Sequence, residues 1–526
     1  MADHIPADVA SWPAGREVVV AGGGTAGMSA ARHLLDLAAR VTIADDRAED
    51  PSAIAGGTEI AGRGARFTTV AALLADDDWT TRTDLVIASP GFAPTHGLPT
   101  AAAVAGIPVW GEVELAWRLD AAGVFGAPRT WLVVTGTNGK TTTTSMLTDI
   151  VTASGRSAQA CGNIGLPVLD AMAAPERVEV LCAELSSFQL HWAPSIAPAA
   201  GLVLNIADDH LDWHGSFDAY ATAKQVALHG AIGVVGLDDP VASGLSAAGR
   251  RVGFTLGDPQ PGELGVRDGV LVDRAFADDP SGVALVQADV IHPAGPSGLA
   301  DALGAAALAR AIGVEPEAVR AALTAFRPAG HRGEVVARIG EIAFVDDSKA
   351  TNPHAAQAAV AAHRRVVLIA GGLLKGASLD AMLDAVGDRL GGVVAIGRDR
   401  GLVVDAIARH APEVPAVTVF TGDDGCVTVA RELPRDPGTD LRSASSVTPI
   451  PAGSDPAVAV MDRAVGIAWD LAEADPARPD AILLAPAAAS LDMFAGYGRR
   501  GDAFATAARA LADVHDASRA EQGRRQ

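Results

Sequence analysis

The stretch VTGTNGKTT at residues 134–142 decides the central part of the fold. It overlaps the end of a short apolar run, WLVVT at 131–135, and opens a helical segment. Consecutive backbone N–H groups from Gly136 to Thr141 can enclose phosphate oxygens, and the dipole of the following helix favours the same negative charge. Lys140 can reach the outer phosphates, and the hydroxyl of Thr141 can bind Mg²⁺. The sequence therefore predicts a strand, a phosphate-binding loop and a helix.

This loop is a variant of the common phosphate-binding pattern. The usual spacing has glycine at residue 134, where this chain has valine. A glycine-rich turn that only precedes a helix is the alternative interpretation. We favour the phosphate loop because a strand and a helix flank it.

A second glycine turn lies near the N-terminus. An apolar run at 16–21 precedes GGGTAG, a helical pattern and another apolar run that ends at Asp45. Gly22, Gly24 and Gly27 have the spacing of a dinucleotide-binding turn, and Asp45 follows eighteen residues after the last of them. The pattern predicts a parallel βαβ unit. Because such a turn can hold any nucleotide diphosphate, an NAD-dependent oxidoreductase stays open as an alternative.

Apolar runs alternate with helical patterns along the chain. Further buried strands are predicted at 84–91, 107–115, 177–184, 201–207, 341–347, 365–372, 392–397, 416–422 and 481–486. A linker is predicted near residue 125 and a hinge at 327–334. The stretch 423–455 has little periodicity, and we interpret it as an insertion or a mobile loop. An α/β protein with several domains follows from this alternation.

Composition excludes several classes of protein. The 526 residues include 41 basic and 63 acidic side chains, and the net charge of −22 argues against a nucleic-acid partner. Three distant cysteines provide neither a disulfide framework nor zinc-ligand spacing. No apolar run approaches the roughly 20 residues of a membrane-spanning helix, and the N-terminus lacks a signal-peptide pattern. We therefore expect a cytoplasmic protein without membrane insertion.

Lysine is rare in this chain. Only four of the 41 basic residues are lysines, at positions Lys140, Lys224, Lys349 and Lys375. Ammonium and guanidinium groups differ in shape and reactivity, so a lysine in an arginine-rich chain is a candidate functional residue.

Polar residues follow the predicted central strands. Glu184 is the last residue of the strand at 177–184, and Asp209 and His210 come after the strand at 201–207. The carboxyl ends of parallel strands face the ligand crevice, where a carboxylate can hold Mg²⁺ and a histidine can bind a metal or act as a base. Lys224 follows fourteen residues after His210. The alternatives are a helix cap for the acid and solvated positions for the others.

The C-terminal strands have similar endings. Acidic, basic and hydroxyl side chains that could contact ribose, phosphate or carboxylate follow these strands at Asp346, Asp347, Lys349, Thr351, Lys375, Ser490, Asp492 and Tyr497. Ordinary turn chemistry is the alternative at each of these positions.

Taken together, these motifs resemble the Mur ligases. The segments that carry the resemblance are GTNGKTT (136–142), GNIGLP (162–167), ELSSFQL (184–190), NIADDHLDWHG (205–215), Lys224, HRGE (331–334), DDSKATN (346–352) and AAASLDMF (487–494). The resemblance implies three domains: a Rossmann-like UDP-substrate domain at 1–124, a central P-loop ATPase-like domain with a mostly parallel sheet at 125–328, and a C-terminal Rossmann-like amino-acid domain at 329–526.

The resemblance also implies the reaction. DSKATN and ASLDMF point to the branch of the family that adds D-glutamate to UDP-N-acetylmuramoyl-L-alanine, with ATP and Mg²⁺ and through an acyl phosphate. Peptidoglycan precursor synthesis in the cytoplasm follows as the expected process, and we expect a monomer. A ligase of the Mur or folylpolyglutamate type with another amino-acid specificity is one alternative. A non-catalytic nucleotide-binding regulator is another.

Roles for individual residues follow from the resemblance. Lys140 would contact the γ-phosphate, Thr141 and Glu184 would serve one Mg²⁺, and His210 would bind a second. Lys224 corresponds to the lysine that is carbamylated in the family, where the carbamate supports the metal site. The implied ATP-binding residues are Gly136, Thr137, Asn138, Gly139, Lys140, Thr141, Thr142, Arg332, Asp347 and Lys349. The implied substrate-binding residues are Gly22, Gly24, Gly27, Asp46, Arg47, Ser89, Gly91, Asn163, Thr351, Lys375, Ser490, Leu491 and Tyr497.

The chain departs from the family pattern at two places. The family has an H-N-x-x-N pattern at the start of a late central helix, where this chain reads SGLAD at 297–301. Ser297, Gly298 and Asp301 thus replace a histidine and two asparagines of the ATP pocket. Tyr497 stands where phenylalanine is common.

Overall fold

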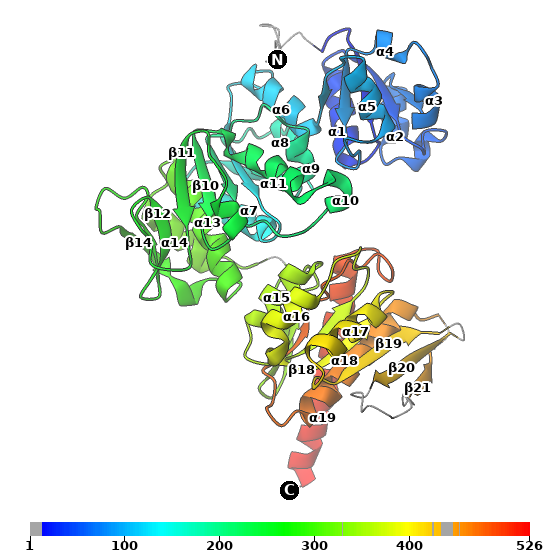
Figure 1. Ribbon diagram of the computed structural model, residues 1–526, viewed down its shortest axis with the longest axis vertical. Helices are drawn as coiled ribbons and strands as arrows, with labels where there is room; N and C mark the ends of the chain where they lie inside the picture. Colours follow the sequence, from blue (N-terminus) through cyan, green and yellow to red (C-terminus); the bar gives the residue numbers. More distant parts are fainter. Residues whose placement is uncertain (1–12, 329, 423–424, 433–444, 452, 526) are drawn as a thin grey trace. The chain divides into compact units, whose positions relative to one another are not determined.

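The computed structural model describes residues 13–328, 330–422, 425–432, 445–451 and 453–525 (Figure 1). The chain forms two compact units. The first contains the described residues up to His292 together with 298–326, and the second contains 293–297 and the described residues from Arg327 onward. Within the described residues, three β-sheets with helices packed around them confirm the predicted α/β class.

The N-terminal sheet has the strand order β3-β2-β1-β4-β5, and all of its pairings are parallel. Its strands are β1 (Glu17–Ala21), β2 (Arg40–Ala44), β3 (Arg66–Thr68), β4 (Leu85–Ala88) and β5 (Val109–Trp110). Its helices are α1 (Thr25–Asp36), α2 (Gly57–Gly62), α3 (Val70–Leu74), α4 (Trp79–Arg82) and α5 (Gly97–Val104). The glycine turn joins β1 to α1, as the βαβ pattern predicts.

The central sheet has the strand order β14-β13-β12-β11-β10-β9-β6-β8-β7. Its strands are β6 (Thr130–Thr135), β7 (Ala158–Gly162), β8 (Val180–Glu184), β9 (Ala200–Val203), β10 (Ile232–Gly236), β11 (Arg250–Phe254), β12 (Glu263–Arg267), β13 (Val270–Asp273) and β14 (Val283–Gln287). The pairings from β7 to β12 are parallel, and those among β12, β13 and β14 are antiparallel. The predicted mostly parallel sheet is therefore confirmed.

The helices of this part are α6 (Glu112–Ala121), α7 (Lys140–Ala153), α8 (Val168–Met172), α9 (Ser187–His191), α10 (Leu211–His214), α11 (Phe217–Gln225), α12 (Pro240–Ser243), α13 (Pro296–Ala311) and α14 (Pro316–Ala325). The strand β6 is buried along Trp131–Thr135. Such a run of apolar and β-branched residues suits a central parallel strand that is covered on both faces. This strand carries the phosphate loop at its carboxyl end.

The second unit contains a sheet with the strand order β15-β16-β22-β17-β18-β19-β20-β21. Its strands are β15 (Glu334–Ile339), β16 (Ile342–Asp346), β17 (Val366–Gly371), β18 (Leu390–Ile396), β19 (Ala416–Thr421), β20 (Cys426–Glu432), β21 (Ser445–Pro449) and β22 (Ala481–Leu484). Its helices are α15 (Pro353–Ala361), α16 (Asp380–Val386), α17 (Arg400–His410), α18 (Pro456–Ala474) and α19 (Tyr497–Arg525). The strands from β16 to β19 are parallel, and β15, β20 and β21 are antiparallel additions.

The interpretation of 423–455 as a mobile loop is wrong for the strand residues that the structure describes, and its interpretation as an insertion stays a prediction. β20 pairs with β19 from Val427 to Glu432, and β21 pairs with β20. Val427 and Val429 are buried and alternate with less buried neighbours, which is the period of a strand with one covered face. Residues 423–424, 433–444 and 452 lie outside the described residues.

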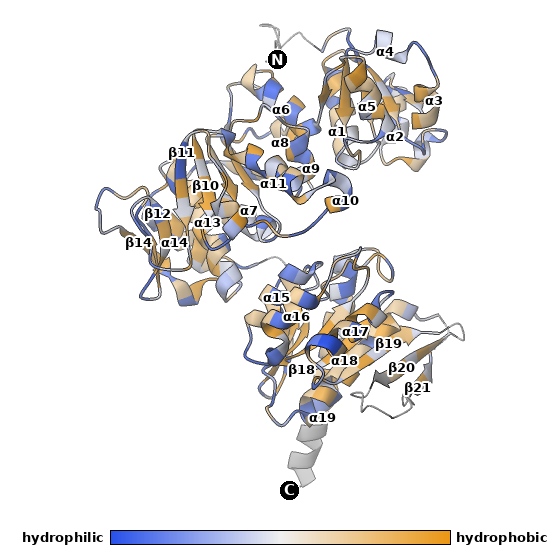
Figure 2. Cartoon of the chain, viewed as in Figure 1, coloured by the Kyte–Doolittle hydropathy of each residue, from blue (hydrophilic) through white to orange (hydrophobic). Residues whose placement is uncertain are grey.

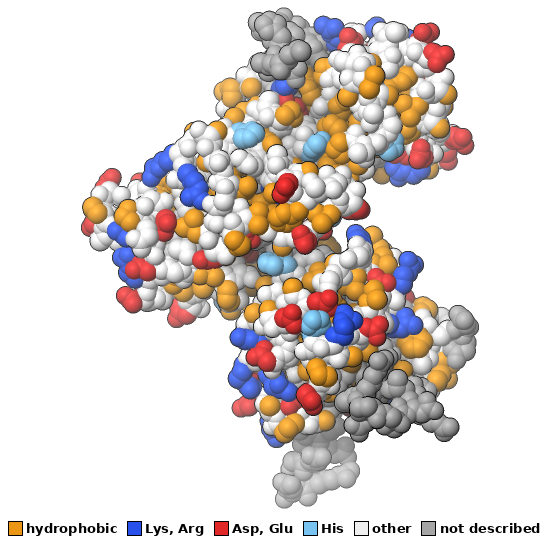
Figure 3. All heavy atoms as spheres, in the orientation of Figure 1, with side chains coloured by type: hydrophobic (Ala, Val, Ile, Leu, Met, Phe, Trp, Pro, Cys, Tyr) orange, Lys and Arg blue, Asp and Glu red, His pale blue; other side chains and the backbone are white. Residues whose placement is uncertain are grey.

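Apolar residues concentrate along the strands of each sheet, and hydrophilic residues colour the loops and outer helix surfaces (Figure 2). Basic and acidic side chains are interspersed on the face drawn in Figure 3. No helix among the described residues is long and apolar enough to cross a membrane. The predicted domain boundaries fall between α6 and β6 and between α14 and β15, and they stay predictions.

Candidate active site

The phosphate loop occupies the turn between β6 and α7. Gly139 has a φ of +85°, and a Cβ at this position would lie 2.1 Å from Oδ1 of Asp301, so only glycine fits. Asn205, after β9, holds the loop from the side. Its Oδ1 accepts hydrogen bonds from the backbone N–H of Thr137 at 3.1 Å and of Asn138 at 2.9 Å, and its Nδ2 donates to the Asn138 carbonyl at 3.2 Å. The neighbouring strand thus fixes the shape of the loop.

Two lysines meet at this loop. Nζ of Lys140 donates to the carbonyl oxygens of Gly136 at 3.0 Å and Thr137 at 2.9 Å. Nζ of Lys224, from α11, donates to the same Gly136 oxygen at 2.7 Å. Burial, reinforced by the charge of Lys140, lowers the pKa of Lys224 well below its ordinary value, although two nearby carboxylates oppose the change. Lys224 is therefore a candidate for a neutral, nucleophilic amine.

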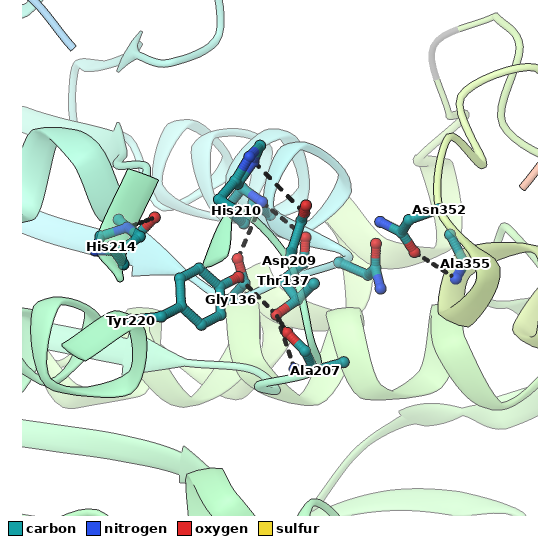
Figure 4. Close-up of polar contacts among 12 residues, drawn as sticks. Gly136, Thr137, Ala207, Asp209, His210, His214, Tyr220, Asn352 and Ala355 are labelled. Atoms are coloured by element: carbon teal, nitrogen blue, oxygen red, sulfur yellow. Dashed lines mark hydrogen bonds and ion pairs between the residues drawn. The ribbon is translucent and has the colours of Figure 1, made fainter. Parts of the chain in front are cut away.

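Tyr220 contacts both the loop and one of these lysines, Lys224, and Figure 4 shows the tyrosine beside Thr137. The hydroxyl of Tyr220 lies 2.9 Å from Oγ1 of Thr137, and its ring lies 4.7 Å from Nζ of Lys224. Thr137 donates its hydroxyl proton to the Ala207 carbonyl at 3.2 Å and accepts from the Ala207 N–H at 2.9 Å. Because the Thr137 proton is used in this way, Tyr220 is the donor to Thr137.

Glu184 ends β8, beside the strand that leads into the phosphate loop. Its residue partner in register on β6 is Val134, and its side chain is buried. Oε1 accepts a hydrogen bond from Nδ2 of Asn163 at 2.9 Å. Oε2 is buried and has no hydrogen-bond partner in the described structure. A buried carboxylate oxygen without a partner is unfavourable unless a cation or a donor arrives with the ligands.

His210 begins α10 with a left-handed φ of 54°. Its Nε2 lies 3.5 Å from Oδ2 of Asp209, and its ring packs against Phe188 with the centroids 4.6 Å apart. Figure 4 shows the two side chains facing each other at the loop that follows β9. The side chain of His210 is 42% exposed.

A pocket of about 460 Å³ lies in the first unit. Predicted substrate residues from both parts of this unit line it, namely Gly22, Gly24, Ser89, Gly91 and Asn163. Gly27 is absent from the lining. A Cβ on Gly27 would lie 2.0 Å from the Gly22 carbonyl, so this glycine allows α1 to pack closely on the turn.

The acidic residue at the N-terminal glycine turn is Asp45. Its Oδ2 accepts from the Gly23 N–H at 2.8 Å, and its Oδ1 accepts from Nε of Arg47 at 2.8 Å. These bonds, above all that from Arg47, hold the pKa of Asp45 well below its usual range. Asp45, the acid that the glycine spacing indicated, thus lies in the turn and holds Arg47 in position. Asp46, implied as a substrate residue, is exposed, and its role stays a prediction.

In the second unit, the predicted residues gather at one edge of the sheet. The loops after β16, β22 and β17 adjoin one another, because the Ala487 N–H donates to the Ala350 carbonyl at 2.9 Å and the Leu373 N–H donates to the Ala489 carbonyl at 2.9 Å. The predicted residues on these loops are Asp347, Lys349, Thr351, Lys375, Ser490 and Leu491. Nζ of Lys349 lies 4.1 Å from the ring centre of Tyr497, which opens α19.

Charge and exposure differ among these residues. Burial raises the pKa of Asp347 to about 7, with the charge of Arg332 opposing the rise and that of Asp346 reinforcing it. Ser490 is buried, whereas Leu491 is 67% exposed and therefore open to solvent or a ligand.

Comparison with known proteins decides the family. Residues 134–255 match the family model described as the Mur ligase middle domain, and residues 16–111 match the one described as the Mur ligase MurD-like N-terminal domain. The UDP-N-acetylmuramoylalanine–D-glutamate ligase of Mycolicibacterium smegmatis is 52% identical over 510 residues, which cover 96% of this chain and 99% of that protein. The protein of the same name from Mycolicibacterium vanbaalenii is 54% identical over 501 residues, which cover 94% and 98%. This chain belongs to the MurD-like Mur ligases.

A solved Mur ligase shares the fold. The crystal structure of MurF ligase from Thermotoga maritima, in complex with ADP, has a TM-score of 0.51 with this chain at 14% sequence identity. The match covers 96% of this chain and 97% of that chain. The predicted recognition of the family from its motifs is therefore confirmed, as is the fold that it implies.

In this Mur ligase, the departure at 297–301 brings a carboxylate to the phosphate loop. Asp301 lies on α13 and is buried. Its Oδ1 accepts a hydrogen bond from Oγ1 of Thr143 at 3.1 Å, and the same oxygen lies against Gly139. Asp301 thus stabilises the first turn of α7 through Thr143 and packs against the phosphate loop at Gly139.

Sequence reasoning missed several residues of this Mur ligase site. Asn205 and Tyr220 lie inside or next to motifs that it quoted, yet their partners on the phosphate loop are about 70–80 residues away in the chain. Arg500 is a third case. Its buried guanidinium donates to Oγ of Ser348 at 3.0 Å and to the Ala488 carbonyl at 3.1 Å, which joins two of the predicted loops. The only sequence signal for it is the pair of arginines in GYGRRG.

Proposed function

We infer that this chain adds D-glutamate to UDP-N-acetylmuramoyl-L-alanine with ATP, as a step in peptidoglycan precursor synthesis. The observation that carries the inference is an identity of 52–54%, over nearly the whole chain, with ligases of that name. The phosphate loop, the neighbouring lysines and the buried carboxylate support it, since each suits a reaction between two anions.

The reaction has two steps. The alanyl carboxylate oxygen first attacks the γ-phosphorus of ATP, so that an acyl phosphate forms and ADP leaves. The amine of D-glutamate then attacks the acyl carbon, the amine loses a proton, and the tetrahedral intermediate releases phosphate as the amide bond forms. Lys140 and the loop N–H groups would hold the phosphates in line for the first step.

The residues near the loop fit Mg²⁺. Glu184 offers a buried oxygen without a partner, and oxygen is the ligand type that Mg²⁺ prefers. Thr141 and Glu184 would hold one ion and His210 a second. Bound Mg²⁺ would neutralise the negative charge of the reacting phosphate and carboxylate groups. Among the described residues no group of three or more His, Cys, Asp or Glu could hold a metal, so the substrates' own oxygens would complete the coordination.

Lys224 is proposed to act as a carbamate. A neutral amine can add to the carbon of carbon dioxide, so that an N–C bond forms, one C–O electron pair moves to oxygen, and a proton leaves the nitrogen. Burial, reinforced by the charge of Lys140, lowers the pKa of this amine and so favours its neutral form. The product is an anion at the phosphate loop, where it would support the metal site.

The remaining assignments concern the substrates. The pocket between the N-terminal glycine turn and Asn163 is proposed for the UDP-muramoyl group. In the second unit, Arg332, Asp347 and Lys349 are proposed for ATP. Thr351, Lys375, Ser490, Leu491 and Tyr497 are proposed to line the ATP and D-glutamate sites, and their gathering at one sheet edge supports this assignment. We also propose a cytoplasmic monomer, which gel filtration would test.

Phosphate release tests the proposed function. We expect release only when ATP, Mg²⁺, UDP-N-acetylmuramoyl-L-alanine and D-glutamate are present together. Parallel reactions with L-glutamate, L-lysine or glycine measure the amino-acid specificity. Purified protein that forms no D-glutamyl product under these conditions, or that prefers another amino acid, would contradict the proposal.

A further inference from the structure

Glu112 lies in the proposed UDP-muramoyl pocket, and the reaction outlined above gives it no role. It is the first residue of α6 and lines the pocket together with Gly24 and Asn163. The residue is 4% exposed although it lines the pocket. Its Oε1 accepts a hydrogen bond from the Leu169 N–H at 2.7 Å, whereas its Oε2 has no hydrogen-bond partner in the described structure.

A charged Glu112 would be costly at this place. A buried carboxylate with one unpartnered oxygen loses its hydration without full compensation. The pocket is also proposed to receive an anionic substrate, whose charge would repel a carboxylate. Both effects favour the neutral acid, which would present an O–H donor on Oε2.

The groups around Glu112 act in the same direction. Burial above all, with the charge of Asp170 on α8, raises the pKa of Glu112 to about 7, while the backbone N–H groups of Leu169 and Val168 oppose the rise. Two side chains of α1 contact Asp170. Its Oδ1 lies 2.8 Å from Nε2 of His33 and accepts a hydrogen bond from Nη1 of Arg32 at 3.0 Å.

The remaining titratable neighbour is the thiol of Cys161 on β7. Burial raises the pKa of this thiol well above its ordinary value, and the charges of Cys182 and Glu112 contribute to the rise. Cys161 therefore stays a neutral thiol around neutral pH, so it adds no charge beside Glu112.

We propose that Glu112 is a binding residue for the UDP-muramoyl substrate and that its Oε2–H donates a hydrogen bond to an oxygen of that substrate. The inference rests on the proposed function, because it takes the substrate from there. The consequence is that Glu112 takes up a proton when the substrate binds at a pH at which the free protein carries the carboxylate. Affinity should therefore rise as the pH falls.

Calorimetric binding of UDP-N-acetylmuramoyl-L-alanine to the full-length protein tests this consequence. We expect the wild type to bind about tenfold more tightly at about pH 6 than at about pH 8, since a group with a pKa near 7 is protonated before binding only at the lower pH. Measurements in two buffers of different ionisation enthalpy should show net proton uptake. The phosphates and carboxylate of the substrate do not titrate in this range.

Glu112→Gln separates a donor from an acceptor. The Leu169 N–H requires an acceptor, so the amide carbonyl of the variant stays there and the amide NH₂ faces the pocket as a donor. We expect this variant to bind at about pH 6 as tightly as the wild type, and to keep that affinity at about pH 8. Glu112→Ala should weaken binding at both pH values.

Glu114→Gln is the matched control on the same helix. Glu114 is buried, and its oxygens already accept from Arg118 at 2.6 Å and from the Ser195 N–H at 3.1 Å. This variant should keep the wild-type pH dependence of binding.

Weaker binding by Glu112→Gln, or a pH dependence that persists in it, would overturn the inference while leaving the ligase function intact. A wild type that does not bind the substrate at either pH would overturn both. If Glu112→Gln does not fold, proton uptake by the wild type decides, and its absence refutes the inference.

Discussion

Replacing Lys224 tests the proposed carbamate most directly. Its Nζ donates to the Gly136 carbonyl at 2.7 Å, and the side chain is only 2% exposed. The same carbonyl accepts from Lys140 at 3.0 Å, so truncation of Lys224 leaves this oxygen bonded. Lys224→Ala should therefore lower the free energy of unfolding mainly through lost packing, by about 2 kcal/mol.

The effect on catalysis should be far larger than this packing loss explains. A carbamate at the phosphate loop would be a fixed charge in a site closed to water, and removal of one such preorganised group lowers kcat by about 10²–10³-fold. Lys224→Arg should lose activity as well. Its guanidinium stays protonated, cannot react with carbon dioxide, and buries a second cation beside Lys140.

D-Glutamate-dependent phosphate release measures the loss, and added acetate or propionate tests its cause. A small carboxylate can occupy the space left by Lys224→Ala, so kcat should rise with its concentration. Lys140→Ala is the matched control, because its missing group is a cation that no carboxylate replaces. In the wild type, ¹³C-labelled bicarbonate should yield a carbamate resonance that Lys224→Ala lacks. Full activity of Lys224→Arg would refute the reasoning, as would a folded Lys224→Ala that no acid rescues.

Glu184→Gln keeps an acceptor for Asn163 but loses its charge, so we expect kcat to fall about 10²–10³-fold and the Mg²⁺ requirement to rise; undiminished turnover in a Mg²⁺ titration would contradict this. Gly139→Ala places a methyl group 2.1 Å from Oδ1 of Asp301 at a φ of +85°. Strain and overpacking should cost about 2–4 kcal/mol in denaturant titrations, and Asp301→Ala should recover part of it. Asp347 has a folded pKa of about 7, above its unfolded value, so its contribution to stability falls as the pH rises from about 4 to about 7. As the pH rises through this range, the free energy of unfolding of Asp347→Asn should therefore increase relative to that of the wild type by up to about 1.4 kcal/mol per pH unit. Urea titrations in which the difference between the two proteins does not change with pH would contradict this prediction.

Much of the fold could be predicted because each parallel strand is a short apolar run that ends in polar residues. β6 is such a run, and Gly139 in the loop after it has a left-handed φ that favours glycine. The hairpin β20–β21 could not be predicted in the same way. Among the described side chains of the hairpin, Val427 and Val429 are the buried ones, and their burial depends on the pairing of β20 with β19 rather than on any local signal.

The candidate site follows the same division. Residues at strand ends, such as Glu184, could be predicted because parallel strands present their carboxyl ends on one side. Residues that position others could not, since Tyr220 and Asn205 bond to a loop far away in the chain. Asp45 could be predicted from the glycine spacing, because it directly follows β2, and it accepts a hydrogen bond from the Gly23 N–H. Its bond to Arg47 could not be predicted, since the sequence does not show which side chain turns toward it.

The rarity of lysine has a separate physical reason at three of the four positions. Lys140 donates to two loop carbonyls from a compact ammonium group, where a planar guanidinium would not fit the same geometry. Lys224 is buried with a lowered pKa, which an arginine cannot match because it keeps its proton. Lys349 places its ammonium 4.1 Å from the ring centre of Tyr497, a contact that arginine could also make but with a larger, flatter group. Lys375 has a left-handed φ of 52°, which does not distinguish lysine from arginine. The proposed carbamate would require the reactivity of a neutral amine at Lys224 alone, whereas the shape of the ammonium group is the reason at Lys140.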